Sequence, residues 1–215
     1  MPQTVDCWDL DGTILHTGRL FAPVIKRVAE VSGKPLKTVA DSLGQVSRVT
    51  FTFQAWFADL GIASAEWAAL ETELRADLAA RAPACVYPGV PELLRARKQA
   101  GVRMVLITAG DPDYQTWKFG LLGLEDVFDL EDRHFVSLSS SKADVIDGYL
   151  ALGPVNFIDD RINWLEEVRG KHTPVHCIRP RWPETSSATP HADDDRLWQT
   201  ATTLEQLQQL LEREA

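Results

Sequence analysis

Two pairs of acidic residues follow short apolar segments that lie far apart in the chain. The first pair is Asp9 and Asp11, with Gly12 next, and the second pair is Asp159 and Asp160. Residues two apart on a strand point the same way, and glycine lets the backbone turn sharply, so Asp9 and Asp11 can face one pocket. If the two segments are neighbouring strands, up to four carboxylates converge, and each like-charged pair about 4 Å apart costs about 4 kcal/mol at an effective dielectric constant of about 20. Such a cluster therefore requires either a cation or raised carboxyl pKa values, and if a cation binds, the all-oxygen ligands favour Mg²⁺ over zinc.

Residues suited to an anionic substrate stand between the two acidic pairs. Thr108, Ala109 and Gly110 follow an apolar segment and offer a hydroxyl and small-residue backbone amides ahead of an expected helix. Such a position can bind phosphate. Lys142 follows Ser141 in the expected first turn of another helix and adds a fixed positive charge. Each signal is weak by itself, but their combination with the acids predicts phosphate chemistry at a metal site.

The order and spacing of these motifs resemble those of the haloacid dehalogenase superfamily, in a form with a helical cap inserted after the first strand. Residues 8–13 (WDLDGT) resemble the family's DxDGT motif, residues 106–111 its second motif, Lys142 its third and residues 157–160 its acidic fourth. Residues 110–124 also resemble a segment common in capped hydrolases of the family. The resemblance spans nearly the whole chain and implies a Rossmann-like core with a cap that closes over it.

The resemblance implies catalytic roles for four residues. Asp9 would be the nucleophile that attacks phosphorus and forms an aspartyl-phosphate. Asp11 would protonate the leaving oxygen and then deprotonate the water that hydrolyses the intermediate, provided that its pKa is high enough to carry the first proton. Thr108 and Lys142 would hold the remaining phosphate oxygens. Dehalogenases and phosphonate-cleaving relatives lack an acid two residues after the nucleophile, so Asp11 favours phosphate esters as substrates.

The resemblance also implies a set of magnesium ligands. The ion would bind an Asp9 oxygen, the Asp11 backbone carbonyl and Asp160, with Asp159 as a direct or water-mediated ligand. Relatives often carry a further Asp four residues beyond the metal-binding Asp, and Trp164 stands at that position here. This departure predicts weaker metal binding.

Short apolar segments alternate with helical patterns along the chain, which predicts an α/β fold with a Rossmann-like parallel sheet. Asp6 lies within the first expected strand, and we expect it at the strand's exposed end. Residues 179–195, rich in Pro, Ser and Thr, are expected to form a loop. Strands are expected at residues 4–8, 102–107, 134–138, 154–158 and 174–178.

The interval between the first two expected strands is too long for an ordinary crossover. About 90 residues separate them, where a βα connection needs far fewer. Val24, Val28 and Val31 recur there at helical spacing, as do four apolar residues between positions 67 and 78. We therefore expect a helical cap at residues 17–84, inserted into a catalytic core formed by residues 1–16 and 85–215.

Large side chains of the cap allow two interpretations. Trp56, Phe57 and Trp67 could line a substrate pocket, but apolar aromatic residues at helical spacing favour a core role. Arg19 and Arg48 could touch an anionic group of the substrate, although arginines in a charged chain are more often surface residues. Because periodicity does not separate pocket from core, the substrate is expected only to be a small phosphorylated metabolite.

Composition restricts the remaining classes. The 215 residues carry a net charge of −9, which argues against nucleic acid as a partner, and the sequence predicts neither an export signal nor a membrane span. Cys7, Cys85 and Cys177 are odd in number and lack CxxC spacing, which favours free thiols and a cytoplasmic location. His172 and His176 are spaced like metal ligands, but their segment is expected to be a strand and their role structural.

Three functions remain open from the sequence. The leading hypothesis is a Mg²⁺-dependent phosphatase, acting as a monomer or homodimer. A phosphosugar mutase is the second, because closely similar chains transfer the phosphoryl group to another hydroxyl. The third is a non-catalytic phosphate-binding or regulatory protein, which the acid missing at Trp164 motivates and the intact Asp9 and Asp11 oppose.

Overall fold

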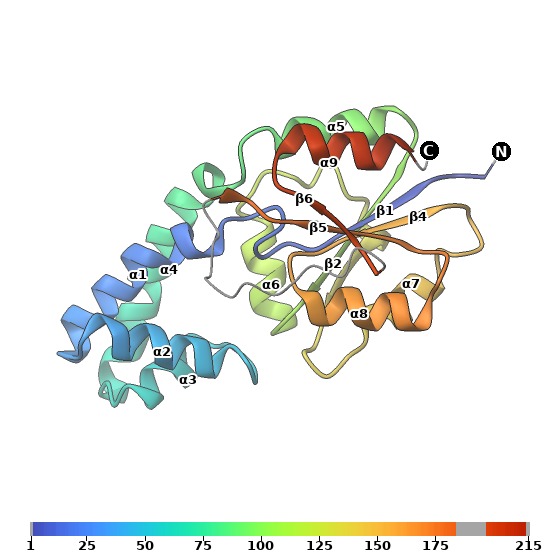
Figure 1. Ribbon diagram of the computed structural model, residues 1–215. Coiled ribbons are helices and arrows are strands. Elements are labelled where there is room, and N and C mark those ends of the chain that lie inside the picture. Colours follow the sequence, from blue (N-terminus) through green and yellow to red (C-terminus); the bar gives the residue numbers. More distant parts are fainter. Residues whose placement is uncertain (1, 184–196, 214–215) are drawn as a thin grey trace.

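The strands form one parallel sheet whose order places the first strand at its centre. A computed structural model describes residues 2–183 and 197–213, and its six strands are arranged in the order β3-β2-β1-β4-β5-β6 (Figure 1). The chain moves outward from β1 to β3 and then returns to the other side of β1, which puts a topological switch point between β1 and β4. The strands are β1 (Val5–Trp8), β2 (Arg103–Ala109), β3 (Arg133–Val136), β4 (Val155–Ile158), β5 (His176–Pro180) and β6 (Gln199–Ala201).

The expected α/β class and its five strands are confirmed, with two differences at the far edge. The strand β5 continues through Arg179 and Pro180, so the expected loop begins later than predicted. The remainder of that loop, from residue 184 to 195, lies outside the described residues. The strand β6 was not expected, because only Ala201 of its three residues is buried and no apolar run announces it.

Helices cover both faces of the sheet, as the alternation of buried side chains on β2 requires. Met104 and Leu106 point into one cluster of apolar side chains, whereas Val105 and Ile107 point into a second. The first face packs against α5 (Val90–Gln99), α6 (Pro112–Phe119) and α9 (Leu204–Arg213), and the second against α7 (Lys142–Asp147) and α8 (Ile162–Lys171) (Figure 1).

The long interval after β1 is helical in the structure and lies beyond the carboxyl ends of the strands (Figure 1). Its main helices are α1 (Thr17–Ser32), α2 (Leu36–Val46), α3 (Phe53–Asp59) and α4 (Trp67–Arg81), which we call the cap. Trp56 and Phe57 are fully buried among these helices, so their core interpretation is confirmed. The aromatic ring of Phe51, between α2 and α3, lies 4.7 Å from that of Tyr114 and joins the cap to α6.

Asp6 is fully buried, and our expectation of an exposed strand end is wrong. The Arg97 guanidinium on α5 donates two hydrogen bonds to the Asp6 carboxylate, at 2.7 and 3.0 Å, and Asn156 on β4 donates a third at 2.7 Å. A charge in the middle of a central strand is tolerated because it is paired and hydrogen-bonded on all sides.

No helix among the described residues is both long and apolar enough to cross a membrane.

Candidate active site

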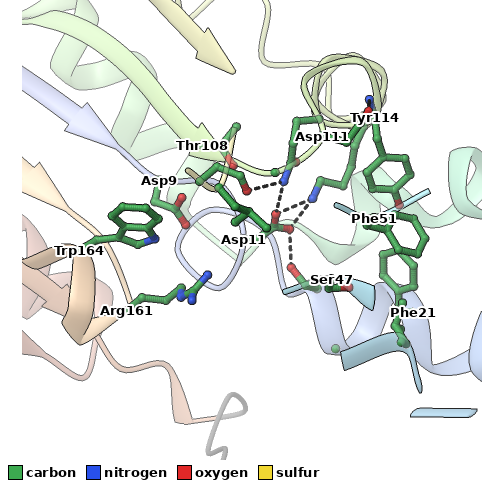
Figure 2. Close-up of a pocket in the computed structure, with 18 of the residues that line it drawn as sticks. Asp9, Asp11, Phe21, Ser47, Phe51, Thr108, Asp111, Tyr114, Arg161 and Trp164 are labelled. Atoms are coloured by element: carbon green, nitrogen blue, oxygen red, sulfur yellow. Dashed lines mark hydrogen bonds and ion pairs between the residues drawn. The ribbon is translucent and has the colours of Figure 1, made fainter. Parts of the chain in front are cut away.

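Most of the sequence-predicted residues lie at the carboxyl ends of β1, β2 and β4, and Figure 2 shows Asp9, Asp11 and Thr108 there. Trp8, the last residue of β1, is in register with Leu106 of β2 and Ile158 of β4. The residue that follows each of these two strands is an aspartate, Asp9 after β1 and Asp159 after β4, and the two lie on either side of the switch point. Parallel strands that end in register bring these carboxylates together, although 150 positions separate them in the chain.

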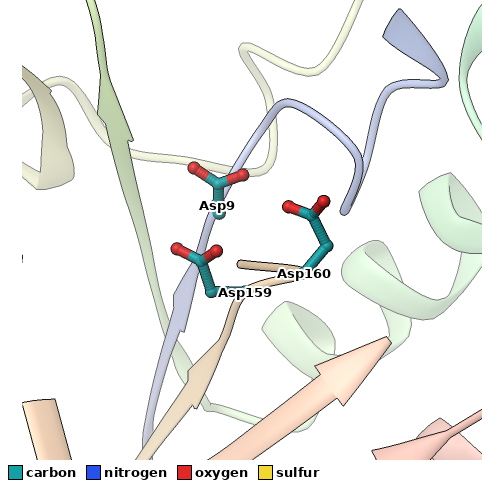
Figure 3. A group of neighbouring side chains, drawn as sticks. All are labelled: Asp9, Asp159 and Asp160. Carbon is teal, nitrogen blue, oxygen red and sulfur yellow. The ribbon is translucent and has the colours of Figure 1, made fainter. Parts of the chain in front are cut away.

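Three carboxylates form a compact cluster there. Asp9, Asp159 and Asp160 each offer an oxygen, and these oxygens lie within 4.8 Å of one another (Figure 3). Of the four acids expected to converge, Asp11 keeps its carboxylate outside this cluster, which leaves its backbone carbonyl as the group that could serve a shared ion.

Lys142 supplies the positive charge inside this cluster. Its ammonium group is completely buried and donates to Asp9 Oδ1 at 2.6 Å and to Asp159 Oδ2 at 2.7 Å. Burial alone would lower the Lys142 pKa, but Asp159 and Asp9 outweigh it and raise the pKa above the ordinary value. The lysine is placed by the start of α7, where the Ser141 side chain caps the helix by accepting from the Asp144 N–H at 3.1 Å, as the sequence predicts.

A single ammonium group does not balance three carboxylates. Burial, with the charges of Asp159 and Asp11, raises the Asp9 pKa to about 7 against the opposing effect of Lys142. Burial and the charges of Asp159 and Asp9 raise the Asp160 pKa well above its usual range. In addition, Asp160 Oδ1 is buried and has no hydrogen-bond partner among the described residues. An unpaired buried oxygen in an all-oxygen set fits a hard divalent cation such as Mg²⁺.

Gly12 and Thr13 position Asp160. The Thr13 hydroxyl accepts a hydrogen bond from the Asp160 N–H at 3.1 Å. Gly12 has φ +84°, and a Cβ atom at this residue would lie 2.4 Å from Asp160 Oδ2. Glycine is thus required both by the backbone conformation and by the close approach of the carboxylate.

Asp11 is held by a different set of partners, on its own side of the cavity. Lys118 on α6 donates to both Asp11 oxygens, at 2.6 and 2.5 Å, Gln115 donates at 3.1 Å, and the Thr17 hydroxyl donates at 2.7 Å. Burial would raise the Asp11 pKa, but Lys118 outweighs it and lowers the pKa below the ordinary value. The raised pKa that an acid role needs is absent in this arrangement, because a buried lysine pairs with the carboxylate.

The residues expected to bind phosphate after β2 differ in the hydrogen-bond donors that they leave available. The Thr108 hydroxyl is buried and has no hydrogen-bond partner among the described residues. Ala109 and Gly110 also line the cavity, but the Gly110 N–H already donates to the Val136 carbonyl at 2.9 Å. The backbone continues β2 pairing there, so Thr108 is the residue whose donor is available to a substrate.

The cavity above these residues has a volume of about 340 Å³, in the range of small-molecule sites. Its core side is formed by the ends of β1 and β2, by α6 and by the start of α8. The cap side is mostly apolar, with Phe21, Ile25, Leu43 and Phe51, and its other lining residues are Thr17, Gly18 and Ser47. 

The residues that the sequence singled out in the cap do not line this cavity. Trp56, Phe57 and Trp67 are absent from its walls, and so are Arg19 and Arg48, which are exposed. The aromatic wall comes instead from α1 and from the segment between α2 and α3, where no periodic pattern distinguishes pocket from core.

The residues of α6 near Asp11 lie in the segment that resembles capped hydrolases, but the sequence assigned them no role at the site. Tyr114, Gln115 and Lys118 lie on one face of α6 and all line the cavity. Lys118 follows Tyr114 by four positions and Gln115 by three, and residues three or four apart share a helix face. This spacing was a usable signal that the three side chains point the same way. Two of them are polar, which an ordinary crossover helix would turn toward solvent.

Trp164 occupies the position where relatives often carry an acid. Its indole ring cannot bind a metal as a carboxylate would, and it lies next to two cationic side chains. Its ring lies 5.4 Å from the Lys142 ammonium and 6.0 Å from the Arg161 guanidinium. Arg161 lines the cavity and forms no ion pair with any of the described residues. The wall next to the carboxylates thus carries a free positive charge.

The two histidines with metal-like spacing have structural roles, as expected. His172 Nε2 lies 3.0 Å from the Ala143 carbonyl, and His176 Nδ1 lies 3.0 Å from Asn156 Oδ1 within the sheet. The three cysteines are free and buried.

Comparisons with known proteins agree with this geometry. Residues 7–167 match the model of a family described as haloacid dehalogenase-like hydrolase. A Burkholderia xenovorans LB400 protein, described as a haloacid dehalogenase-like hydrolase, has a TM-score of 0.71 and 17% identity, covering 97% of this chain and 96% of its own. Bacillus subtilis YfnB, described as a HAD-hydrolase and bound to magnesium, has a TM-score of 0.64 and 16% identity, with coverages of 98% and 99%.

A third solved structure is described as a β-phosphoglucomutase from Thermotoga maritima. It has a TM-score of 0.65 and 16% identity, and the match covers 99% of this chain and all of the other. At such identities the likeness shows a shared fold. No curated protein matches the sequence.

Proposed function

The chain belongs to the haloacid dehalogenase-like hydrolases, and from that premise we propose that it is a Mg²⁺-dependent phosphomonoester hydrolase that works through an aspartyl-phosphate. The substrate we propose is a small phosphorylated metabolite, and the protein would act as a monomer or homodimer. One observation carries the proposal. Asp9 and Asp11 face the same cavity, each with its own buried lysine, so one carboxylate is available for attack and another for proton transfer.

Asp9 performs the first step in this scheme. One of its oxygens attacks phosphorus in line while the bond to the leaving oxygen breaks, and the product is an acyl phosphate on the side chain. Lys142 holds Oδ1 at 2.6 Å and so restricts the carboxylate to one orientation. The unpartnered Thr108 hydroxyl is free to donate to a phosphoryl oxygen, and the Arg161 guanidinium adds positive charge at the same wall.

Asp11 suits the second step as the structure presents it. Its carboxylate is ionised, held by Lys118, and can take a proton from the water that attacks the acyl phosphate. The first step needs the opposite state, a proton on Asp11 for the leaving alkoxide. That role therefore requires the contact with Lys118 to loosen when substrate binds.

The metal would be held by Asp9, Asp160 and the Asp11 carbonyl, with Asp159 next to them. When bound, Mg²⁺ would supply the charge that the carboxylates lack and would stabilise the charge of the phosphoryl group. The unpaired Asp160 oxygen supports this assignment.

Phosphate release from a panel of phosphorylated metabolites tests the proposal. We expect release with Mg²⁺ and its loss both in Asp9→Asn and in the presence of a chelator. Asp41→Asn is the matched control, because Asp41 is exposed on α2 and, among the described residues, its ion-pair partner is the exposed Lys37. Turnover that survives Asp9→Asn would contradict the aspartyl mechanism. Conversion between phosphosugar isomers that depends on a bisphosphate activator, with slow phosphate release, would replace the hydrolase by a mutase.

A further inference from the structure

The cavity has two chemically different sides, and the side formed by the cap is mostly apolar. We infer that this side binds an apolar leaving group, so that the substrate is a phosphate monoester of a short aliphatic or aromatic alcohol and not of a sugar. The inference rests on the phosphatase activity proposed above. The residues concerned, which we call the apolar wall, are Phe21, Ile25, Leu43, Phe51 and Tyr114.

Three rings of the apolar wall support one another. The centre of Phe51 lies 4.7 Å from that of Tyr114 and 6.0 Å from that of Phe21, both in edge-to-face contact. The three side chains are at most 7% exposed. Figure 2 shows them as a column along one side of the cavity. Edge-to-face contacts fix ring orientations, so the wall presents a preformed apolar surface to whatever enters.

The column lies where a leaving group would be. In Figure 2, Asp11 stands between Asp9 and the three rings. An in-line attack by Asp9 expels the leaving oxygen on the far side of phosphorus, and the acid that protonates this oxygen must lie next to it. The alcohol part of the substrate is thus directed past Asp11 toward the apolar wall.

Few polar atoms on this side could bind the hydroxyl groups of a sugar. The hydroxyl of Thr17 and the ammonium of Lys118 are already engaged with Asp11. The Tyr114 hydroxyl and Gln115 Oε1 are buried and have no hydrogen-bond partner among the described residues, and the Ser47 hydroxyl lines the same cavity, so these three groups can each bind a polar atom of the substrate. Further hydroxyls would lose water without a replacement, and each loss costs about tenfold in affinity.

The experiment compares substrates that differ only in apolar length or in hydroxyl groups. For n-alkyl monophosphates from ethyl to pentyl, we expect kcat/KM to rise about fourfold for each methylene until the cavity is full. Propyl phosphate and glycerol 1-phosphate have the same chain length, and we expect propyl phosphate to be favoured by about tenfold, the cost of one hydroxyl that the apolar wall leaves unpaired. A flat series, or a preference for glycerol 1-phosphate, would overturn the inference.

Substitutions in the wall locate the effect. With Phe51→Ser, we expect kcat/KM to depend little on alkyl length. The value for glycerol 1-phosphate should change less than the value for propyl phosphate. Val49→Ser is the matched control, because Val49 lies in the same segment, is 77% exposed and does not line the cavity. Tyr114→Phe should keep the alkyl series and lose selectivity only among substrates with a second polar atom. If Phe51→Ser does not fold, the substrate series of the unaltered protein still decides.

Binding measurements separate this inference from the proposed activity. Calorimetry with n-alkyl phosphonates and Mg²⁺ reports affinity without turnover, and we expect the dissociation constant to fall about fourfold per methylene. The heat-capacity change should become more negative with length, as burial of apolar surface requires. If no monoester is hydrolysed but phosphonate affinity increases with alkyl length, the proposed activity is wrong and the binding of an apolar group by the wall is confirmed. If phosphonate affinity does not depend on length, the wall does not bind the alkyl group and the inference fails.

Discussion

Gly12→Ala tests how closely the loop after β1 is fitted to the carboxylates that we propose to bind the metal. The φ of +84° costs a residue with a Cβ about 1–2 kcal/mol. The new atom would also lie 2.4 Å from Asp160 Oδ2, where contacts of about 3.4 Å are ordinary, so Asp160 must move by about 1 Å. We expect Mg²⁺ affinity to fall by tenfold or more, because displaced coordination partners typically cost about 10- to 100-fold.

Gly101→Ala separates the two effects. Gly101 follows α5, has the same φ of +84°, and a Cβ there would meet nothing within 4 Å. The Gly101→Ala variant therefore has the backbone strain without the steric clash. Its free energy of unfolding should fall by about 1–2 kcal/mol while its Mg²⁺ affinity stays at the wild-type value.

The assay is thermal or urea unfolding of both variants over a range of Mg²⁺ concentrations. A ligand that binds only the folded state stabilises it by RT ln(1 + [L]/Kd), so the concentration dependence reports Kd for each variant. A Gly12→Ala protein with wild-type Mg²⁺ affinity would refute the reasoning, because Asp160 would then not be the ligand that the loop confines. Equal losses of affinity in both variants would refute it as well, since backbone strain alone would explain them.

Three further substitutions probe the buried charges. Arg97→Met leaves Asp6 buried without its cation and should lower the free energy of unfolding by about 3–5 kcal/mol. The control is Arg95→Met, which removes a more exposed ion pair and should lower it by less than about 1 kcal/mol. Urea unfolding measures both values, and equal losses would contradict the role of the Arg97–Asp6 pair. Lys142→Gln should abolish phosphate release and make stability strongly dependent on Mg²⁺, which parallel unfolding with chelator checks. Lys118→Met should lower kcat by about 100-fold with Mg²⁺ affinity retained, as a loss of acid–base catalysis predicts; a weakened metal site would instead assign Lys118 a structural role.

Local patterns in the sequence were sufficient for the sheet and the cluster of acids. The strands β1 and β4 are short apolar runs, and Asp9 and Asp159 each stand one position after such a run, so the parallel arrangement alone brings these two residues together. Thr108 is predictable because it lies near the end of β2, and Lys142 because it follows the Ser141 cap of α7. The edge strand β6 escaped prediction because three residues with one buried side chain carry no pattern.

The sequence by itself determined the fold class, the family and the order of the motifs, because these depend on periodicity and on spacing along the chain. The tertiary structure decided which groups face one another. Lys118 reaches Asp11 across 107 positions and sets its ionisation, and Arg97 makes a buried Asp6 tolerable. The same holds for the apolar wall of the cavity. A pattern records that a side chain is apolar, but only packing determines whether it contacts its own helix bundle or faces the substrate.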